Sequence, residues 1–419
     1  MKLTRLYEIF RQYPQVTTDS RKVTEGSIFF ALRGDKFDGN RFAAQAIADG
    51  AVMAVVDDVS MCPDGANYFV VDDVLATLQE LARMHRRVLG LPVVAVTGTN
   101  GKTTTKELLT AVLAKKCRVA STRGNLNNHI GVPLTLLSLT PADEVAVVEM
   151  GASACGEIAA LCSIAEPDYG IITNIGRAHL DGFGGVEGIR RGKGELYDWL
   201  TANGGRAFVN SADEVLMTMV QERTKLEATP YSPLTVEGWK SNLVGEYNLF
   251  NIAAAVAVGA HFGVEHELMR EAIADYEPTI HRSQVMRSEN NVVIADCYNA
   301  NPSSMEAALR NFAKMPLPEG VTQKVAILGD MLELGAWSRD EHAKAFADAR
   351  HAVGAGELLL VGSEFSKVAP AEKGTPRTVH TFADRTELEK YIARKPISEA
   401  LVLVKGSNGV GLEKILSLL

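Results

Sequence analysis

The feature that most constrains the fold is an apolar run that leads directly into a glycine-bracketed turn and a Lys-Thr pair. Residues 93–96 read Val-Val-Ala-Val, and residues 97–105 read Thr-Gly-Thr-Asn-Gly-Lys-Thr-Thr-Thr. A buried strand, a tight turn and a helix in this order form a phosphate-binding loop, because glycines let successive backbone N–H groups face phosphate oxygens. Lys102 adds a positive charge, and the Thr103 hydroxyl can ligate Mg²⁺. The segment predicts a nucleoside-triphosphate site in an α/β domain.

This turn departs from the general phosphate-loop pattern at its first glycine. Val96 stands five residues before Gly101, where the pattern has glycine, and the first glycine here is Gly98. A glycine-rich turn without a ligand is the alternative, but strand, turn, Lys-Thr pair and helix all follow in order. We expect nucleotide contacts along the whole turn, from Gly98, Thr99, Asn100, Gly101, Lys102, Thr103 and Thr104.

Length and composition narrow the class of protein. A chain of 419 residues is too long for one hydrophobic core, which favours three domains. It is 46% hydrophobic and has no apolar run of membrane-spanning length, so we expect no membrane insertion. A net charge of -8 argues against a general nucleic-acid surface. The lack of a visible secretory signal and five scattered cysteines predict a cytoplasmic location.

Apolar, β-branched strands alternate with helical stretches over most of the chain. A helix is expected over 74–89, and strands are expected over 93–97, 145–149, 169–173, 206–209, 291–296, 324–328, 358–361 and 400–404. This alternation predicts mostly parallel sheets covered by helices. The fold class is therefore α/β, with a small mixed domain at 1–88, a central P-loop domain at 89–281 and a Rossmann-like domain at 282–419.

Two polar residues stand where strands end. Glu149 closes the strand 145–149, and His179 follows the strand 169–173. Ligands of open α/β sheets lie at the carboxyl ends of the strands, and a carboxylate and an imidazole beside a phosphate loop can complete a metal shell. Two alternatives stay open, because Glu149 could be an anion at a helix N-terminus and His179 a hydrogen-bonded loop histidine.

Three further segments have less specific patterns. The amide-rich segment 125–133 could line a polar substrate groove, and we expect substrate contact from Asn127 and a catalytic role for Asn128. The mixed-charge segment 190–197 reads as a solvated helix face by itself. Asn301, in Asn-Ala-Asn-Pro, could simply cap a helix.

Five segments together resemble the Mur ligase family, the ATP-dependent amide-forming enzymes of peptidoglycan precursor synthesis. In order and approximate spacing they are residues 97–105, 149–151, 174–180, 193–195 and 247–251. The resemblance implies a UDP-muramoyl substrate on the N-terminal domain, ATP on the central domain and an amine substrate on the C-terminal domain. It also implies a cytoplasmic enzyme that is monomeric.

Within the family, three passages are similar to members that add D-alanyl-D-alanine to UDP-N-acetylmuramoyl-tripeptide. They are residues 19–39, 296–303 and 328–335. The resemblance implies an acyl-phosphate intermediate and release of ADP and phosphate. Alternatives are the ligase that adds the third amino acid, a folate-glutamate ligase and an inactive nucleotide-binding homologue. Asn40 and Asn408 depart from the family, which frequently has His and Arg there.

The resemblance also assigns roles residue by residue. Thr103 and Glu149 correspond to ligands of one Mg²⁺ ion, and His179 and a carbamylated Lys193 to ligands of a second. Lys102, Lys193 and His179, with Asn128, form the expected catalytic set. The remaining assignments are Asn251 for adenine, Arg282 for ATP phosphate, Asp296 for ribose, Ser20 and Arg21 for uridine, and Tyr298, Asn299 and Asn301 for the dipeptide.

Overall fold

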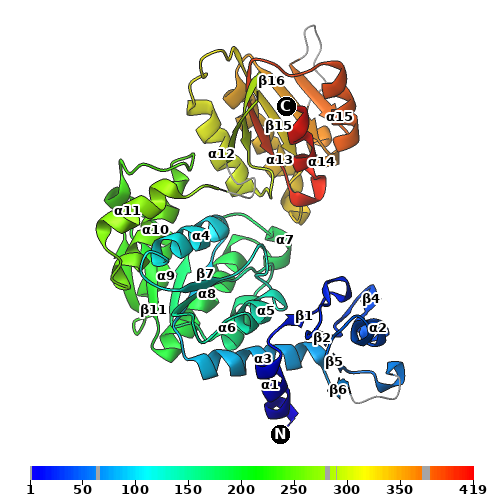
Figure 1. Ribbon diagram of the computed structural model, residues 1–419. Coiled ribbons are helices and arrows are strands. Elements are labelled where there is room, and N and C mark those ends of the chain that lie inside the picture. The colour runs from blue at the N-terminus through cyan, green and yellow to red at the C-terminus, as the bar shows by residue number, and fades with distance from the viewer. Residues whose placement is uncertain (1, 63–66, 279–283, 289, 370–377) are drawn as a thin grey trace.

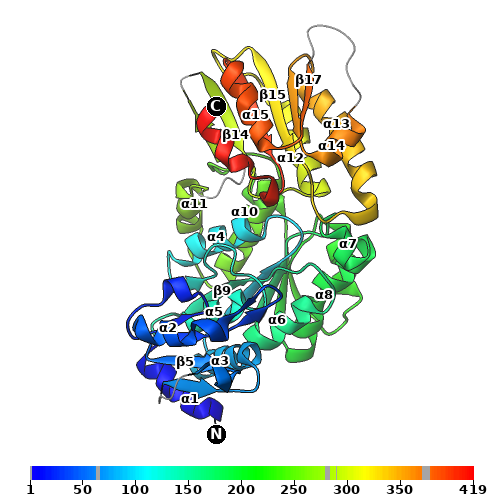
Figure 2. The ribbon, with the colours of Figure 1, turned by 90° about the vertical axis from the view of Figure 1, so that its right-hand side faces the viewer.

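Three mostly parallel sheets follow one another along the chain and lie in three lobes (Figures 1 and 2). The structure is a computed structural model that describes residues 2–62, 67–278, 284–288, 290–369 and 378–419. The N-terminal lobe and the C-terminal lobe lie at opposite ends of the central one. Within these residues, no helix has the length and apolar character needed to cross a membrane. The α/β class predicted from the sequence is confirmed, and the exact domain bounds stay a prediction.

The N-terminal lobe has a four-stranded parallel sheet in the order β1-β2-β5-β6 and a separate hairpin. Its strands are β1 (Val16–Thr17), β2 (Ile28–Phe30), β5 (Met53–Val56) and β6 (Tyr68–Val70), with the hairpin β3 (Arg33–Gly34) and β4 (Phe37–Asp38). Its helices are α1 (Lys2–Gln12), α2 (Ala43–Ala48), α3 (Val74–Leu89) and the short η1 (Ser20–Lys22), η2 (Gly39–Phe42) and η3 (Val59–Met61). Asp73 caps α3, and the left-handed Gly90 ends it, so the predicted helix 74–89 is confirmed.

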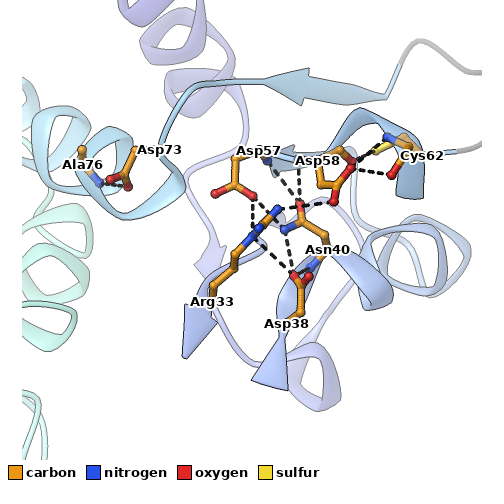
Figure 3. Close-up of polar contacts among 9 residues, drawn as sticks. Arg33, Asp38, Asn40, Asp57, Asp58, Cys62, Asp73 and Ala76 are labelled. Carbon is orange, nitrogen blue, oxygen red and sulfur yellow. Dashed lines mark hydrogen bonds and ion pairs between the residues drawn. The ribbon is translucent and has the colours of Figure 1, made fainter. Parts of the chain in front are cut away.

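Asn40, one of the two departures from the family resemblance, makes several hydrogen bonds in the N-terminal lobe. Its fully buried amide lies between the hairpin and the turn after β5 (Figure 3). The Nδ2 group donates to Asp38 at 2.9 Å and to Asp57 at 2.8 Å, while Oδ1 accepts from the N–H groups of Asp57 and Asp58. An asparagine can satisfy both sets because it carries a donor and an acceptor on one planar group. The residue therefore holds this loop together.

Replacing Asn40 with alanine should lower the free energy of unfolding by about 2–4 kcal/mol, because two backbone N–H groups lose their buried acceptor. Denaturant unfolding measures this change. The matched control is Arg33→Ala, since Arg33 is 48% exposed and its bonds to Asp57 and Asp58 lie at the surface. We expect the control to change stability by less than about 1 kcal/mol. Equal effects of the two substitutions would contradict the role given to Asn40.

The central lobe has a six-stranded parallel sheet in the order β12-β11-β10-β7-β9-β8. Its strands are β7 (Val93–Thr97), β8 (Val119–Ser121), β9 (Val145–Glu149), β10 (Tyr169–Ile172), β11 (Arg206–Asn210) and β12 (Glu227–Tyr231). Its helices are α4 (Lys102–Leu113), α5 (Gly131–Leu137), α6 (Glu157–Ala165), α7 (Leu180–Phe183), α8 (Val186–Asn203), α9 (Glu214–Gln221), α10 (Tyr247–His261), α11 (His266–Asp275) and η4 (Pro233–Val236).

Alternate residues of β7 belong to two different cores. Val94 and Val96 pack in the cluster that contains Leu108 of α4, while Val93 and Ala95 belong to the cluster on the opposite face. Both faces of the strand are therefore covered, which is why it reads as a continuous apolar run. A ligand can therefore reach β7 only at the carboxyl end of the strand, where the glycine turn begins.

The C-terminal lobe has a six-stranded sheet in the order β13-β14-β18-β15-β16-β17, parallel except for the antiparallel edge pair β13–β14. Its strands are β13 (Gln284–Arg287), β14 (Asn291–Ala295), β15 (Gln323–Gly329), β16 (Glu357–Val361), β17 (Val379–Phe382) and β18 (Ala400–Lys405). Its helices are α12 (Pro302–Lys314), α13 (Ser338–Val353), α14 (Ser363–Val368), α15 (Arg385–Arg394), η5 (Gly335–Trp337), η6 (Asn408–Val410) and η7 (Leu412–Leu418).

Candidate active site

The turn between β7 and α4 has the geometry of a phosphate-binding loop. Gly98 and Gly101 have φ angles of 134° and 80°, which favour glycine. A Cβ atom on Gly98 would lie 2.0 Å from the Thr173 hydroxyl, so a larger residue does not fit. The N-cap residue of α4 is Gly101, which makes no side-chain cap, so the first N–H groups of the helix can face an anion. Lys102 Nζ donates to the Gly98 carbonyl at 2.9 Å and to the Thr99 carbonyl at 3.0 Å.

The loop after β10 supports this turn. Asn174 accepts from the Asn100 N–H at 3.1 Å and donates to the Asn100 carbonyl at 3.0 Å. Thr173 donates to the same carbonyl at 2.6 Å. The backbone N–H and the backbone carbonyl of Asn100 are therefore both held by hydrogen bonds. The turn is organised before any ligand arrives.

Glu149 ends β9 beside the phosphate loop and is almost completely buried. Its Oε1 accepts from Asn127 at 2.8 Å, and its N–H donates to Thr122 at 3.0 Å. The other oxygen, Oε2, is buried and has no hydrogen-bond partner among the residues that the structure describes. A carboxylate oxygen left in this way is costly unless a cation or water binds it, so the site fits a hard divalent cation. Across the described parts of the chain, no three His, Cys, Asp or Glu side chains gather as a complete ligand set.

Lys193 lies inside α8 and is only 2% exposed. Its Nζ donates to the Ala152 carbonyl at 3.0 Å and lies 5.1 Å from the centre of the Phe183 ring. Burial, helped by the positive charge of Lys102, lowers the pKa of Lys193 to about 7. A substantial share of the amine, about half at pH 7, is therefore in its neutral, nucleophilic form.

His179 lies at the edge of the central lobe, immediately before α7, and has a left-handed φ of 51°. Its Nδ1 contacts the carboxylate of Glu333, a residue of the C-terminal lobe. Burial lowers the pKa of the imidazole, an effect that the Glu333 carboxylate opposes. His179 is therefore hydrogen-bonded through Nδ1 and not through Nε2 in this contact, and its metal role stays a prediction.

A cleft of about 810 Å³ joins the phosphate loop to the C-terminal lobe. One wall carries the loop, Glu149 and His179, and the other carries residues after β14. The predicted site residues that line the cleft are Thr99, Asn100, Gly101, Lys102, Thr103, Thr104, Asn127, Asn128, Glu149, His179, Asn251, Asp296, Tyr298, Asn299 and Asn301.

Two side chains of the cleft are already engaged by the protein. Asn301 caps α12 by accepting from the Ser304 N–H at 2.9 Å, and its Nδ2 donates to Asn100 Oδ1 at 2.7 Å. Asn251 accepts from Thr105 and donates to Asn248, and a Cβ atom on Gly101 would lie 2.5 Å from it. Both residues thus support the loop, whatever else they contact.

The remaining predicted residues lie elsewhere. Ser20 and Arg21 are in the N-terminal lobe and do not line the cleft, and Arg21 is 86% exposed in a two-point contact with Asp19. Gly98 and Lys193 are not among the residues that line the cleft. Arg282 lies outside the described residues.

Several residues that line the cleft were not predicted as site residues, including four polar ones. Lys405 ends β18, is almost fully buried and donates to Asp296 at 2.6 Å. Its position at a strand end was a usable signal. The other three, at the carboxyl end of a strand or the start of α10, are Asn174, Tyr247 and Asn248.

A phosphate loop that faces a second α/β lobe across a polar cleft defines the class as a nucleotide-dependent α/β enzyme. Three family models match the chain: "Mur ligase family, catalytic domain" over residues 12–123, "Mur ligase middle domain" over 96–235, and "Mur ligase, glutamate ligase domain" over 281–408. The chain belongs to the Mur ligase family.

Three similar proteins match this chain over nearly its whole length. The chain is 33% identical to the UDP-N-acetylmuramoyl-tripeptide--D-alanyl-D-alanine ligase of Bacillus subtilis, covering 96% of this chain and 92% of that protein. It is similar, at 30% identity and a TM-score of 0.82, to MurF from Acinetobacter baumannii, covering 96% of this chain and 92% of that one. MurF from Thermotoga maritima in complex with ADP has a TM-score of 0.82 at 26% identity, with 96% of each chain covered.

Proposed function

We propose that the protein joins D-alanyl-D-alanine to the terminal carboxylate of UDP-N-acetylmuramoyl-tripeptide and forms the UDP-muramoyl-pentapeptide. The activity named in the relatives supports this reaction. The single structural observation that carries it is the cleft in which the phosphate loop and Glu149 face residues 296–301. Such a cleft can hold a phosphoryl donor and two substrates next to one another.

The reaction uses ATP because a carboxylate is a poor electrophile. A carboxylate oxygen attacks the γ-phosphorus, the bond to the β-phosphate oxygen breaks, and ADP leaves. The dipeptide amine then attacks the acyl carbon, the carbon–oxygen bond to phosphate breaks, and phosphate leaves as the amine loses a proton. Lys102 and the N–H groups of the turn stabilise negative charge on the phosphates during the first step.

Thr103 and Glu149 would hold one Mg²⁺ ion, and His179 and Lys193 a second. The unpartnered Oε2 of Glu149 supports the first assignment. Bound Mg²⁺ offsets repulsion between the carboxylate and the triphosphate. Asn127 would orient the Glu149 carboxylate, because it donates to Oε1 and leaves Oε2 available to a cation.

A protonated lysine amine has no lone pair with which to bind a cation. We infer that Lys193 binds the second Mg²⁺ ion after its amine has been converted into an anionic ligand. Addition of CO₂ to the neutral amine forms a carbamate, and the depressed pKa of Lys193 supports this step. Protein labelled with ¹³C-bicarbonate should show one carbamate carbon signal that Lys193→Met removes. A signal that persists in the variant would contradict carbamylation at this position.

The domain roles follow the same proposal. The N-terminal domain, 1–88, would hold the uridine end through Ser20 and Arg21, and the central domain, 89–281, would bind ATP with help from Asn251. The C-terminal domain, 282–419, would bind the dipeptide at Tyr298, Asn299 and Asn301. Asp296 would contact ribose, Arg282 ATP phosphate, Asn127 substrate, and Asn128 would assist catalysis. Asn408 donates to the Tyr298 carbonyl at 3.3 Å, so this departure lies beside the proposed amine site.

Mass spectrometry of the product tests the reaction. The protein is incubated with ATP, Mg²⁺ and UDP-muramoyl-tripeptide, with and without D-alanyl-D-alanine. We expect pentapeptide, and repeated turnover to ADP and phosphate, only when the dipeptide is present. A parallel reaction offers the muramoyl dipeptide with lysine or diaminopimelate, and another offers folate with glutamate. Product from either of these pairs, with none from D-alanyl-D-alanine, would contradict the proposal.

A further inference from the structure

The segment around Glu333 was singled out by its sequence, but the proposed reaction gives it no role. Four hydrogen bonds fix this segment inside the C-terminal lobe. Asp330 accepts from two N–H groups at the start of α14, each at 2.9 Å. The Met331 N–H donates to the buried His342 at 3.0 Å, and the Leu332 N–H donates to Ser407 at 3.0 Å. The turn that follows is therefore held rigidly in place.

This turn is packed against the His179 segment of the central lobe. Leu180 and Phe183 of α7 belong to the same buried cluster as Met331 and Leu334. A Cβ atom on Gly335 would lie 2.4 Å from the Asp181 carboxylate, so the Gly335 backbone closely approaches the Asp181 side chain. Figures 1 and 2 show α7 at the edge of the central lobe that faces the C-terminal lobe.

His179 and Glu333 are both held in the left-handed region, at φ angles of 51° and 61°. Residues with side chains adopt this conformation only where the surroundings enforce it. Here it brings the Glu333 carboxylate onto His179 Nδ1. The Glu333 side chain is 62% exposed, so the pair adds little stability, and its consequence is the orientation of the ring.

We propose that Glu333 is a positioning residue that orients His179 for metal binding from the opposite lobe. A carboxylate on Nδ1–H fixes the tautomer in which Nε2 carries the free lone pair, as outer carboxylates do for metal-binding histidines. Because this carboxylate belongs to the C-terminal lobe, the His179 site is complete only when the two lobes are docked. The inference rests on the proposed metal role of His179.

The test compares Glu333→Ala and Glu333→Gln with the matched control Glu306→Gln. Glu306 also pairs across the two lobes, with Arg177 at 2.7 Å, but it does not contact His179. Two readouts need no turnover: the ring ¹⁵N signals of His179 in metal-free protein, assigned with a His179→Gln sample, and Mn²⁺ binding by electron paramagnetic resonance with a non-hydrolysable ATP analogue.

We expect Glu333→Ala to show mixed ring tautomers and to weaken the second Mn²⁺ by about 10–100-fold. Glu333→Gln should restore the single tautomer through its amide oxygen, and Glu306→Gln should match the wild type. An unchanged tautomer and affinity in Glu333→Ala would overturn the role of Glu333, as would an equal loss in Glu306→Gln. A wild-type protein that binds no Mn²⁺ at His179 would instead overturn the metal assignment itself.

Discussion

Replacing Lys193 with methionine is expected to abolish ligation and to make the folded protein more stable at pH 7. The activity should fall by about 10³-fold or more, because methionine cannot become an anionic metal ligand. Stability should rise because the buried amine has its pKa lowered from 10.5 to about 7. Removing that amine should raise the free energy of unfolding by about 2–4 kcal/mol in CO₂-free buffer at pH 7.

The pH dependence of this stability difference has a definite sign. Between about pH 7 and 10.5 the unfolded chain keeps a proton on Lys193 that the folded protein releases. The unfolding free energy of the wild type therefore rises with pH across this window, and the advantage of the variant shrinks. Below pH 7 the difference should be at its full size.

Denaturant unfolding at several pH values, together with product assays, measures both effects. The matched control is Lys324→Met, because Lys324 also donates to backbone carbonyls and has its pKa lowered by burial, but it does not line the cleft. We expect the control to keep its activity. A Lys193→Met protein that ligates normally, or that shows no stability gain at pH 7, would contradict this account.

Replacing Lys102 with alanine is expected to lower phosphate release by about 10²–10³-fold while the UDP-muramoyl substrate still binds. The Lys102 amine donates hydrogen bonds to the Gly98 and Thr99 carbonyls of the phosphate loop, where it can reach a bound triphosphate. The N-terminal lobe, proposed to hold uridine, is not changed by this substitution. The effect should therefore appear in kcat and ATP affinity.

Phosphate release and calorimetric binding of UDP-muramoyl-tripeptide separate these effects. Lys115→Ala is the control, because Lys115 follows the other end of α4 and pairs with Glu271 at 3.2 Å. Its turnover should equal that of the wild type. Unchanged turnover in Lys102→Ala would contradict the phosphate-loop role, and it would also favour the inactive-homologue alternative over an enzyme.

Much of the fold could be predicted from local patterns, because the apolar periodicity that defines a helix or a buried strand lies within one segment of the chain. The expected strand 93–97 and helix 74–89 match β7 and α3, and strand 145–149 matches β9. These segments carry continuous apolar runs or helical periodicity with clear ends. The short edge strands β12, β13 and β17 were not predicted, since their residues are partly exposed and β12 contains a proline.

Contacts between distant segments could not be predicted in this way. His179 and Glu333 are 154 positions apart, and Asn100 and Asn301 are 201 apart. No local periodicity signals such pairs, because they depend on how the lobes dock. The Asn40 cluster similarly joins a hairpin to the turn after β5 through one buried amide. The sequence predicted a carboxylate at the end of the strand, Glu149, but only the structure shows that one of its buried oxygens lacks a hydrogen-bond partner among the described residues.

The transfer of a carboxylate oxygen tests most directly whether this cleft activates a carboxylate. UDP-muramoyl-tripeptide carrying ¹⁸O in its terminal carboxylate is ligated to D-alanyl-D-alanine with ATP, and the released phosphate is analysed by mass spectrometry. We expect one ¹⁸O atom in each phosphate, because the carbon–oxygen bond breaks when the amine attacks. Pentapeptide formed together with unlabelled phosphate would contradict it.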